Sequence, residues 1–305
     1  MDLRWLEDLQ ALAEELNFSR AAAQRNVTQP AFGRRIRALE DWCGTELFDR
    51  KTHRIRLTPA GEIMLSAAKD VTHRLDRARR EVDDLLSETN TLTIASTHAL
   101  SFTFFPDWIR SLGSEAIQIP IHLLADNMVG CERMMRDGRA QFLLCHYHPE
   151  TEIRLDADEF SFEPVGTDVL VPIAKRGADG QAMFRLSLDS DDPVPLLRFD
   201  DRSGMGRIIS AALPNFGKLR ATTVFTSHLA VVLRKLASEG MGIAWSPESI
   251  ISDDLALSGD LGIAGGEEWR IPVTVILLRP RRKLSKLGEH FWEEVRNRRI
   301  EKSDR

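Results

Sequence analysis

Residues Asn17–Glu40 read NFSRAAAQRNVTQPAFGRRIRALE, a segment that predicts two short helices joined by a tight turn. Ser19 is a candidate cap of the first helix, and Phe18 is placed to pack back onto Ala23 as a hydrophobic staple. The three consecutive alanines are small enough for another helix to cross closely over this one. Asn26 tolerates the backbone conformation of a turn, so the first helix is expected to end there.

The second predicted helix follows Thr28, a candidate cap, and tolerates Pro30 in its first turn. Apolar residues at spacings i, i+4 and i+7 predict one buried stripe, made of Phe32, Ile36 and Leu39. Small and cationic residues occupy the opposite side, namely Pro30, Gly33, Arg34 and Arg37. A cationic helix mounted on a small crossing helix is typical of insertion into the major groove of DNA.

This segment and the two that follow it, GTELFDR and IRLTPAGE, resemble the N-terminal signature of LysR-type transcriptional regulators. The ordered blocks make the signature far more specific than a bare helix-turn-helix pattern. The rest of the chain resembles the family in its length and its alternation of strands and helices. Within the family, RNVTQPAFGRRIRALE, GMGRII and GIAWSPE look most similar to the hypochlorite-responsive regulators.

The resemblance, together with the charge of the second helix, implies a set of DNA contacts. Gln29 is expected to reach base edges, Arg34 a base or a phosphate, and Ser19 and Arg50 phosphates. The complete predicted set is Ser19, Thr28, Gln29, Pro30, Gly33, Arg34, Arg37, Arg50 and Arg54. The family often has a small hydroxyl residue where Gly33 stands, so this chain lacks the hydroxyl that would make that contact.

Composition indicates a cytoplasmic protein of more than one domain. The chain has 305 residues, of which 43% are hydrophobic, and no apolar run approaches the length of a membrane span. Its first residues, MDLRWLEDLQ, are acidic and amphipathic, unlike a signal peptide. Cys43, Cys131 and Cys145 show neither paired nor metal-binding spacing, so we expect reduced thiols, no metal and no cofactor.

The net charge of −5 is unevenly distributed along the chain. Residues 20–58 carry nine Lys and Arg against four Asp and Glu, a local charge of +5, and residues 270–305 carry eleven against five, a local +6. Residues 59–269 carry twenty against thirty-two, a local −12. The N-terminal positive segment coincides with the predicted recognition helix, as expected for a protein that binds double-stranded DNA. The C-terminal one is either a solvated helix face or a surface that pairs with an acidic neighbour.

Other N-terminal elements complete a winged helix-turn-helix over residues 1–58. A first helix is expected from about Asp2 to Glu15, with its buried side made of Trp5, Leu6, Leu9, Leu12 and Leu16. The alternation in Ile55–Leu57 after the cationic loop Lys51–Arg54 predicts a β wing beside the DNA backbone.

A long linker helix is expected next, within residues 59–90. It begins at Thr58-Pro59 and reaches about Leu86. Apolar residues form two tracks at seven-residue spacing, one of Met64, Val71, Ala78 and Leu85 and one of Ala68, Leu75 and Val82. This pattern predicts dimerisation through the helix, because an apolar stripe on a protruding helix needs a partner. A helix packed only on its own chain is the alternative.

Residues 91–305 read as short apolar strands alternating with helices, which predicts an α/β fold with mostly parallel sheets. Strands are expected at 92–95, 117–124, 141–145, 169–174, 194–198, 221–225, 242–245 and 272–279, and helices at 102–112, 128–136, 206–213, 229–238 and 284–298. The family resemblance implies a two-lobed effector domain like the type-2 periplasmic-binding proteins. The chain would then cross between lobes near Asp156–Phe162 and again near Ser258–Ile271.

Polar residues follow three of the expected strands, where ligands bind in open α/β sheets. These clusters are Ser96–His98, Asp200–Gly204 and Thr226–His228, and the family commonly holds a small effector with the first and third. The alternative is that the hydroxyls merely cap helices. The full predicted effector set is Ser96, Thr97, His98, Asp200, Ser203, Met205, Thr226, Ser227 and Trp245.

Oxidation is a second way in which this region could sense a signal. Met205 and Met241 fall in segments expected near the cleft, and conversion of a thioether to a sulfoxide changes both polarity and packing. Ordinary gap-filling methionine is the alternative. Cys145 lies beside His146 and His148, but a buried inert thiol is the simpler interpretation.

Catalytic motifs are missing from the sequence: there is no dinucleotide loop, nucleophile elbow or phosphate-binding loop. The sequence therefore predicts no enzyme but a DNA-binding transcription regulator, controlled by a small effector or an oxidant. A homodimer or homotetramer is expected, with RNA polymerase as a further candidate partner and no membrane partner. The alternative is an α/β solute-binding or enzymatic protein with an appended helical arm, which the basic N-terminal module argues against.

Overall fold

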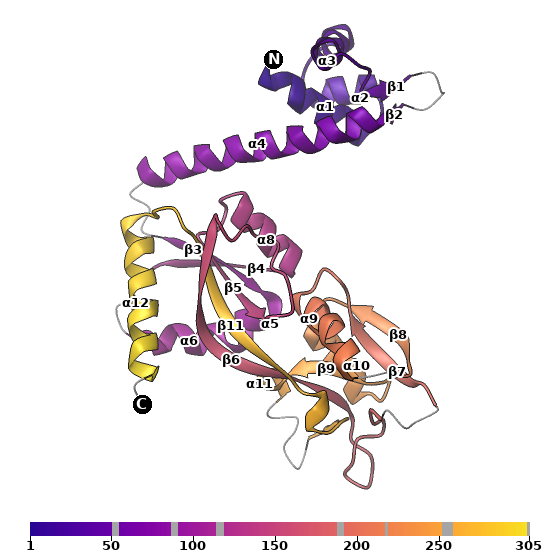
Figure 1. The fold of residues 1–305 in the computed structure, drawn as a ribbon, viewed down its shortest axis with the longest axis vertical. Helices are drawn as coiled ribbons and strands as arrows, with labels where there is room; N and C mark the ends of the chain where they lie inside the picture. Colours follow the sequence, from indigo (N-terminus) through magenta and orange to yellow (C-terminus); the bar gives the residue numbers. More distant parts are fainter. Residues whose placement is uncertain are drawn as a thin grey trace. The chain divides into compact units, whose positions relative to one another are not determined.

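A computed structural model of the protein describes residues 1–50, 55–86, 91–113, 119–187, 192–216, 219–251 and 259–303. The chain forms two compact units, Met1–Asp83 and Asp84–Arg305 (Figure 1). The division falls within the long helix, so most of that helix belongs to the N-terminal unit. None of the helices in the described ranges is both long enough and apolar enough to cross a bilayer.

The N-terminal unit is a three-helix module with a short β hairpin. Its elements are α1 (Leu3–Glu15), α2 (Phe18–Gln24), α3 (Gln29–Cys43), β1 (Phe48–Asp49), β2 (Arg56–Leu57) and α4 (Pro59–Leu86). The predicted stripe of α3 is buried and packs with the apolar side of α1, as the sequence indicated. Leu16 is an exception, because it is 48% exposed and ends α1 in the left-handed conformation.

The capping of α2 differs from the sequence prediction. The cap is Asn17, whose side chain accepts hydrogen bonds from the backbone amides of Ser19 and Arg20 at 2.9 and 3.0 Å. Phe18 packs edge-on against the ring of Phe32, with 6.0 Å between centroids, whereas the predicted partner Ala23 is exposed. Thr28 does precede α3, but its side chain makes no capping hydrogen bond.

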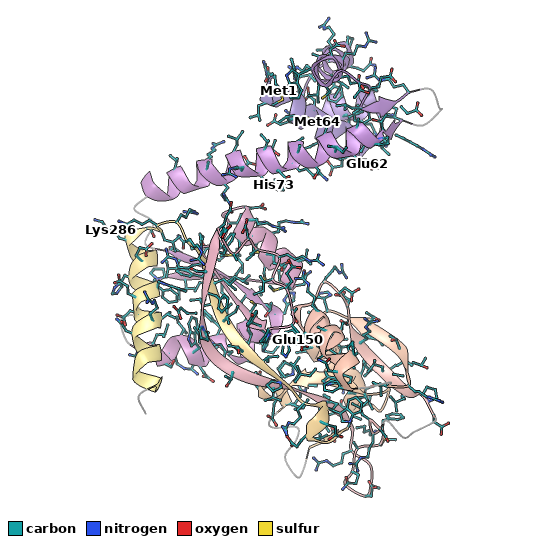
Figure 2. All side chains as sticks on the ribbon, in the orientation of Figure 1. Met1, Glu62, Met64, His73, Glu150 and Lys286 are labelled. Atoms are coloured by element: carbon teal, nitrogen blue, oxygen red, sulfur yellow. The ribbon has the colours of Figure 1, made fainter. Side chains whose placement is uncertain are left out.

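The chain leading into the wing is held by a buried carboxylate of α3 and by a close backbone contact with α4. β1 and β2 pair antiparallel, with Phe48 opposite Leu57. Glu40 accepts the backbone amides of Leu47 and Phe48 at 3.0 and 3.3 Å, which fixes the chain leading into the wing. Gly61 in the first turn of α4 lies against the carbonyl of Leu47, where a Cβ atom would collide. Figure 2 shows Glu62 and Met64 at this end of α4 and His73 further along the helix.

The C-terminal unit has two lobes. Lobe 1 contains β3 (Leu92–Thr97), α5 (His98–Thr103), α6 (Phe105–Ser111), β4 (Ile121–Asp126), α8 (Met128–Arg136), β5 (Phe142–Tyr147) and α12 (Lys286–Ser303). Lobe 2 contains β7 (Val194–Phe199), α9 (Gly204–Ala212), β8 (Ala221–Ser227), α10 (Ala230–Ser238), β9 (Ala244–Pro247), α11 (Glu248–Ile251) and β10 (Leu261–Ile263), with 3-10 turns at Leu213–Phe216 and Glu267–Trp269. Two long strands, β6 (Phe160–Lys175) and β11 (Ile271–Pro280), run through both lobes (Figure 1).

The paired strands β6 and β11 carry the chain between the lobes. They are antiparallel from Pro280 opposite Phe160 to Ile271 opposite Leu170. On β6, Val165 packs against the lobe 1 core and Leu170 belongs to the lobe 2 core. On β11, Val275 belongs to the lobe 1 core and Val273 belongs to the lobe 2 core. The crossings therefore lie several residues beyond the predicted segments, because strand pairing continues through the junction.

Helices cover both faces of the lobe 1 sheet, in which β3 is parallel to β4 and β5. Aromatic residues of α6 and α12 pack on one face, and Met128, Cys131 and Met135 of α8 pack on the other. The single helix predicted over residues 102–112 is two helices, α5 and α6. The break falls at Phe104, two residues before Pro106, whose ring removes a backbone donor.

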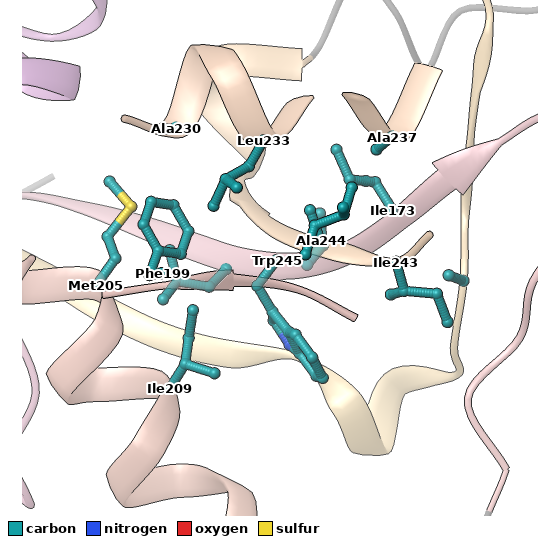
Figure 3. Packing of buried hydrophobic residues seen from close by; sticks show 14 of the residues in the cluster. Ile173, Phe199, Met205, Ile209, Ala230, Leu233, Ala237, Ile243, Ala244 and Trp245 are labelled. Carbon is teal, nitrogen blue, oxygen red and sulfur yellow. The ribbon is translucent and has the colours of Figure 1, made fainter. Parts of the chain in front are cut away.

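The lobe 2 core gathers residues of α9, α10, β7, β9 and β6. Figure 3 shows Met205 beside the ring of Phe199 at one edge of this cluster, while Trp245 lies further inside. The predicted strands and helices of this region are present with shifted ends. The start of α9, which carries Met205, lies at this edge of the cluster and faces lobe 1.

Candidate functional site

The solvent-facing side of α3 is polar and cationic. The residues on the side opposite the buried stripe are all exposed, namely Thr28, Gln29, Pro30, Arg34 and Arg37. Among the described residues, Arg34 and Arg37 have no ion-pair partner that would neutralise them. A Cβ atom at Gly33 would meet nothing within 4 Å, so this side of the helix is open.

Other arginines of the module hold the helices together. Asp8 on α1 is fully buried, and its carboxylate pairs with Arg25 at 3.0 Å and with Arg35 at 3.4 Å. These two contacts fix α2 and α3 against α1. Arg34 and Arg37 project from the other side of α3 and are left available for a ligand.

The two predicted phosphate contacts, Ser19 and Arg50, differ in how accessible their side chains are. Ser19 is exposed near the start of α2, so its hydroxyl is accessible. Arg50 pairs with Glu40 and lies 5.3 Å from the ring centroid of Phe18. Its charge is thus already engaged within the module. Arg54 lies outside the described residues.

A small cavity of about 30 Å³ lies between the two lobes of the C-terminal unit. It is formed where β3, β4 and β7 end and where α5, α8 and α9 begin. The lining residues are Thr97, His98, Ala99, Asp126, Asn127, Met128, His146, Phe199, Ser203, Gly204, Met205, His228 and Ala230. Since a site for one water needs about 10–15 Å³ of such volume, the cavity accommodates only two or three water-sized groups.

Four predicted effector residues line this cavity, namely Thr97, His98, Ser203 and Met205. Thr97 is the most informative of them, because its buried hydroxyl has no hydrogen-bond partner among the described residues. Ser203 caps α9 by accepting the amide of Gly206 at 3.4 Å. Gly206 must be a glycine, since a Cβ atom there would collide with the carbonyl of Asp200.

The remaining predicted residues lie outside the cavity lining. Ser96 is buried, and its hydroxyl donates to the carbonyl of Thr97 at 3.2 Å. The hydroxyl of Ser227 accepts the amide of Leu229 at 3.1 Å in the turn before α10, and α10 has no side-chain cap. Thr226 is exposed on β8, and Asp200 pairs with Arg202 at 2.9 Å.

Trp245 requires a correction, because it is a core residue and not part of the cavity. Only 2% of its surface is exposed, and its indole N–H donates to the carbonyl of Trp269 at 3.1 Å. Its position on β9 faces the lobe 2 core (Figure 3). The sequence pattern, an aromatic residue after a glycine-rich strand start, does not distinguish a residue that lines a cleft from one that packs in the core.

Two histidines face each other across the cavity. The rings of His98 on α5 and His228, which precedes α10, are 5.8 Å apart. Burial lowers the pKa of His98, the carboxylate of Asp126 opposes this shift, and His228 adds to it. Nδ1 of His228 is 3.9 Å from the carboxylate of Asp200. His98 of lobe 1 and His228 of lobe 2 thus each have a carboxylate nearby.

Two thioethers line the same cavity. Met205 is 5% exposed at the start of α9, and Met128 is 2% exposed at the start of α8. The sequence interpretation identified Met205 but missed Met128, together with Asp126, Asn127, His146 and Phe199. The sequence offered a signal for two of these residues that was not used: Asp126 and Asn127 follow a predicted strand, as Ser96 and Thr97 do. Met241 is 46% exposed and does not line the cavity.

The buried cysteines are poorly suited to redox chemistry. Burial raises the pKa of Cys131 to about 12 and raises that of Cys145 well above its ordinary value. Both thiols are therefore protonated at neutral pH, and the thiolate is the reactive form. Within the described ranges, no three His, Cys, Asp or Glu side chains are grouped to hold a metal ion, those around Cys145 included.

Comparison with known proteins agrees with this architecture. Residues 3–62 match the family described as bacterial regulatory helix-turn-helix protein, lysR family, and residues 87–299 match the LysR substrate binding domain. The chain belongs to the LysR family of transcriptional regulators. It is a DNA-binding regulator with an effector-binding domain, and its homologues are regulators and not enzymes.

Several LysR-family proteins are similar over nearly the full chain. The regulator YjiE of Escherichia coli is 30% identical over 304 residues, which cover 97% of this chain and 94% of YjiE. Full-length HypT of Salmonella typhimurium, a hypochlorite-specific regulator, is 29% identical with a TM-score of 0.58, covering 97% and 98% of the two chains. DarR of Vibrio fischeri, solved in complex with DNA, is 29% identical with a TM-score of 0.55 and the same coverage.

Proposed function

We propose that this LysR-family regulator reads its operator with the exposed face of α3. The observation that carries the proposal is the pair Arg34 and Arg37, exposed beside Gln29 on a helix whose other face is packed. A guanidinium makes bidentate contacts to guanine, and an amide makes them to adenine. Ser19 adds a phosphate contact at the neighbouring helix, and the engaged side chain of Arg50 contributes less.

Quantitative operator binding tests this assignment. Arg34→Ala should weaken binding by about 1–3 kcal/mol and relax specificity if Arg34 contacts a base, or reduce the salt slope by about one if it contacts a phosphate. Arg4→Ala is the matched control, because Arg4 is an exposed arginine on α1, outside the proposed surface. Unchanged affinity and salt slope in Arg34→Ala would remove α3 as the recognition helix.

For the signal, we propose oxidation at Met205 in preference to capture of an anionic metabolite. The cavity has room for only two or three water-sized groups and is lined by two thioethers, one carboxylate and no lysine or arginine. An anion would face Asp126 without a fixed positive charge. Transfer of one oxygen atom from hypochlorite to the sulfur oxidises the thioether by two electrons and releases chloride. The similarity to hypochlorite-specific HypT supports this proposal.

Two variants separate oxidation from ligand binding in a reporter assay. Met205→Ile keeps an apolar side chain that cannot form a sulfoxide, so it should blunt induction by hypochlorite. Thr97→Val removes the unpartnered hydroxyl, so it should impair a response to a bound ligand and leave the oxidant response largely intact. Full hypochlorite induction in Met205→Ile would rule out Met205 as the required sensor.

We further propose that the regulator works in the cytoplasm as a dimer or tetramer assembled through α4. Val71, Leu75 and Val82 of the heptad tracks are 40%, 48% and 52% exposed, which an isolated helix would leave in water. Ala68 instead packs within the N-terminal module, and the side chain of Leu85 lies outside the described set. RNA polymerase remains a candidate partner for transcription activation.

A further inference from the structure

A buried ion pair joins the two lobes beside the cavity. Glu132 lies on α8 in lobe 1 and is 1% exposed, and Arg207 lies on α9 in lobe 2 and is 11% exposed. The guanidinium donates twice to the carboxylate, from Nη1 to Oε1 at 2.7 Å and from Nη2 to Oε2 at 3.0 Å. This bidentate geometry fixes both the distance and the orientation of the two helices.

Further contacts hold the carboxylate in place. Oε1 of Glu132 also accepts the backbone amide of Arg154 at 2.9 Å, so the carboxylate is anchored within lobe 1. Nε of Arg207 has no hydrogen-bond partner among the described residues, which leaves Glu132 as the group that holds the guanidinium. The side chains of Asn215 and Glu150 make another contact between the lobes at 3.0 Å, but that contact is exposed.

The ion pair is close to the proposed sensing residues along the same two helices. Met128 begins α8 four residues before Glu132, and Met205 lies two residues before Arg207 on α9. At a rise of about 1.5 Å per residue, the pair stands roughly one turn or less from both cavity methionines along the helix axes. Movement of either helix start is thus transmitted to the ion pair.

We propose that Glu132 and Arg207 are positioning residues that clamp the lobes together and thereby set the stimulus dose at which the regulator responds. The proposal rests on the proposed sensing at Met205. Oxidation replaces the apolar thioether of Met205 by a polar sulfoxide next to Phe199 and Met128, which weakens the packing between the helix starts and favours their separation. The clamp opposes that separation, because separating the helices breaks the two charge-assisted hydrogen bonds between Arg207 and Glu132. The stronger the clamp, the more stimulus is needed.

Dose-response curves of the full-length regulator test the clamp. Glu132→Gln keeps the side-chain shape but removes the charge, and it should lower the hypochlorite dose for half-maximal reporter induction roughly tenfold. Glu132→Asp retains the charge and should shift the dose less. A purely structural role would also lower the stability of the variants. Thermal unfolding of each variant therefore measures the loss of stability separately from the shift in dose.

Glu289→Gln is the matched control. Glu289 accepts a bidentate pair from Arg279 at 2.7 and 2.9 Å, but both residues belong to lobe 1. This variant should lower stability without changing the half-maximal dose. An unchanged dose in Glu132→Gln, or an equal shift in both variants, would overturn the clamp.

A distance measurement tests the clamp without any stimulus, so that its failure can be told from failure of the proposed signal. Spin labels at Asp107→Cys on α6 and Lys235→Cys on α10 report the separation of the lobes, in a Cys43→Ser background. Glu132→Gln should broaden and lengthen the distance distribution relative to the labelled parent, and Glu289→Gln should not. Identical distributions in the parent and in Glu132→Gln would refute the clamp even if Met205 proves to be the sensor.

Discussion

At the scale of single residues, Gly33 stands where the family resemblance leads us to expect a small hydroxyl residue. It lies within α3 with open space on the side where a Cβ atom would stand. Gly33→Ser should raise stability by about 0.5 kcal/mol, because serine has the better helix propensity. If that side faces DNA, the added hydroxyl should also tighten binding to all operators alike by a phosphate contact. Unfolding and binding titrations measure both effects, and weaker binding would show that the site is sterically closed in the complex.

His98 makes the stability of the effector domain sensitive to acid. Its pKa is lowered in the folded protein, chiefly by burial, so its neutral form is favoured by folding. That contribution is present above the unfolded pKa of about 6.5 and is lost as pH falls through the lower folded value. Asp126, His228, His146 and Asp200 are the other titratable groups around it.

Thermal unfolding across this range checks the prediction. Acidification below about pH 6.5 should lower the Tm of the parent more than that of His98→Gln. His122→Gln, which changes an exposed histidine on β4, serves as the control. Parallel pH profiles for the parent and His98→Gln would contradict this role.

Residue roles were only partly predictable, for reasons that differ by site. The buried stripe of α3 follows from helical periodicity, which depends on local sequence alone. The cap of α2 is Asn17 and not Ser19, a difference of two residues in register. Trp245 was misassigned because a strand-end aromatic residue can face either the core or the cleft, and only packing decides which.

At the scale of elements, α4 carries the test of assembly. Leu75→Asp would place a charge in the exposed apolar track, where an unpaired ion is costly once the track is buried. We expect sedimentation to show a smaller species while the effector domain stays folded. Ile63→Asp is the control, because Ile63 is 74% exposed on the same helix but lies outside both tracks. An unaltered oligomer in Leu75→Asp would exclude this seam.

Element boundaries were less predictable than the elements themselves. Alternating apolar segments revealed the strands, but β6 extends over 16 residues because β11 pairs with Phe160–Leu170 and β9 and β10 pair with the rest of the strand. Pairing partners distant in sequence decide where such a strand ends, and periodicity does not report them. The predicted helix over residues 102–112 failed at a proline, which is a local signal that could have been used.

At the scale of the whole molecule, the family resemblance predicted both the winged module and the two-lobed domain. It did not predict the cavity lining from Asp126 to Met128, nor the ion pair between Glu132 and Arg207. The residues of that pair are 75 positions apart and lie in different lobes. Charge pattern along the chain cannot show which of many acidic and basic residues meet across a junction. Three-dimensional packing supplied that information.

The most direct test of the account is a map of genomic occupancy and transcript changes, with and without hypochlorite, in cells carrying the wild-type regulator or Met205→Ile. We expect the wild-type protein to occupy a defined set of promoters whose transcripts change on exposure. In Met205→Ile the same promoters should be occupied, but their transcripts should no longer respond. Equal transcript changes with both proteins would contradict sensing at Met205, and the lack of any specific occupancy would contradict operator recognition by α3.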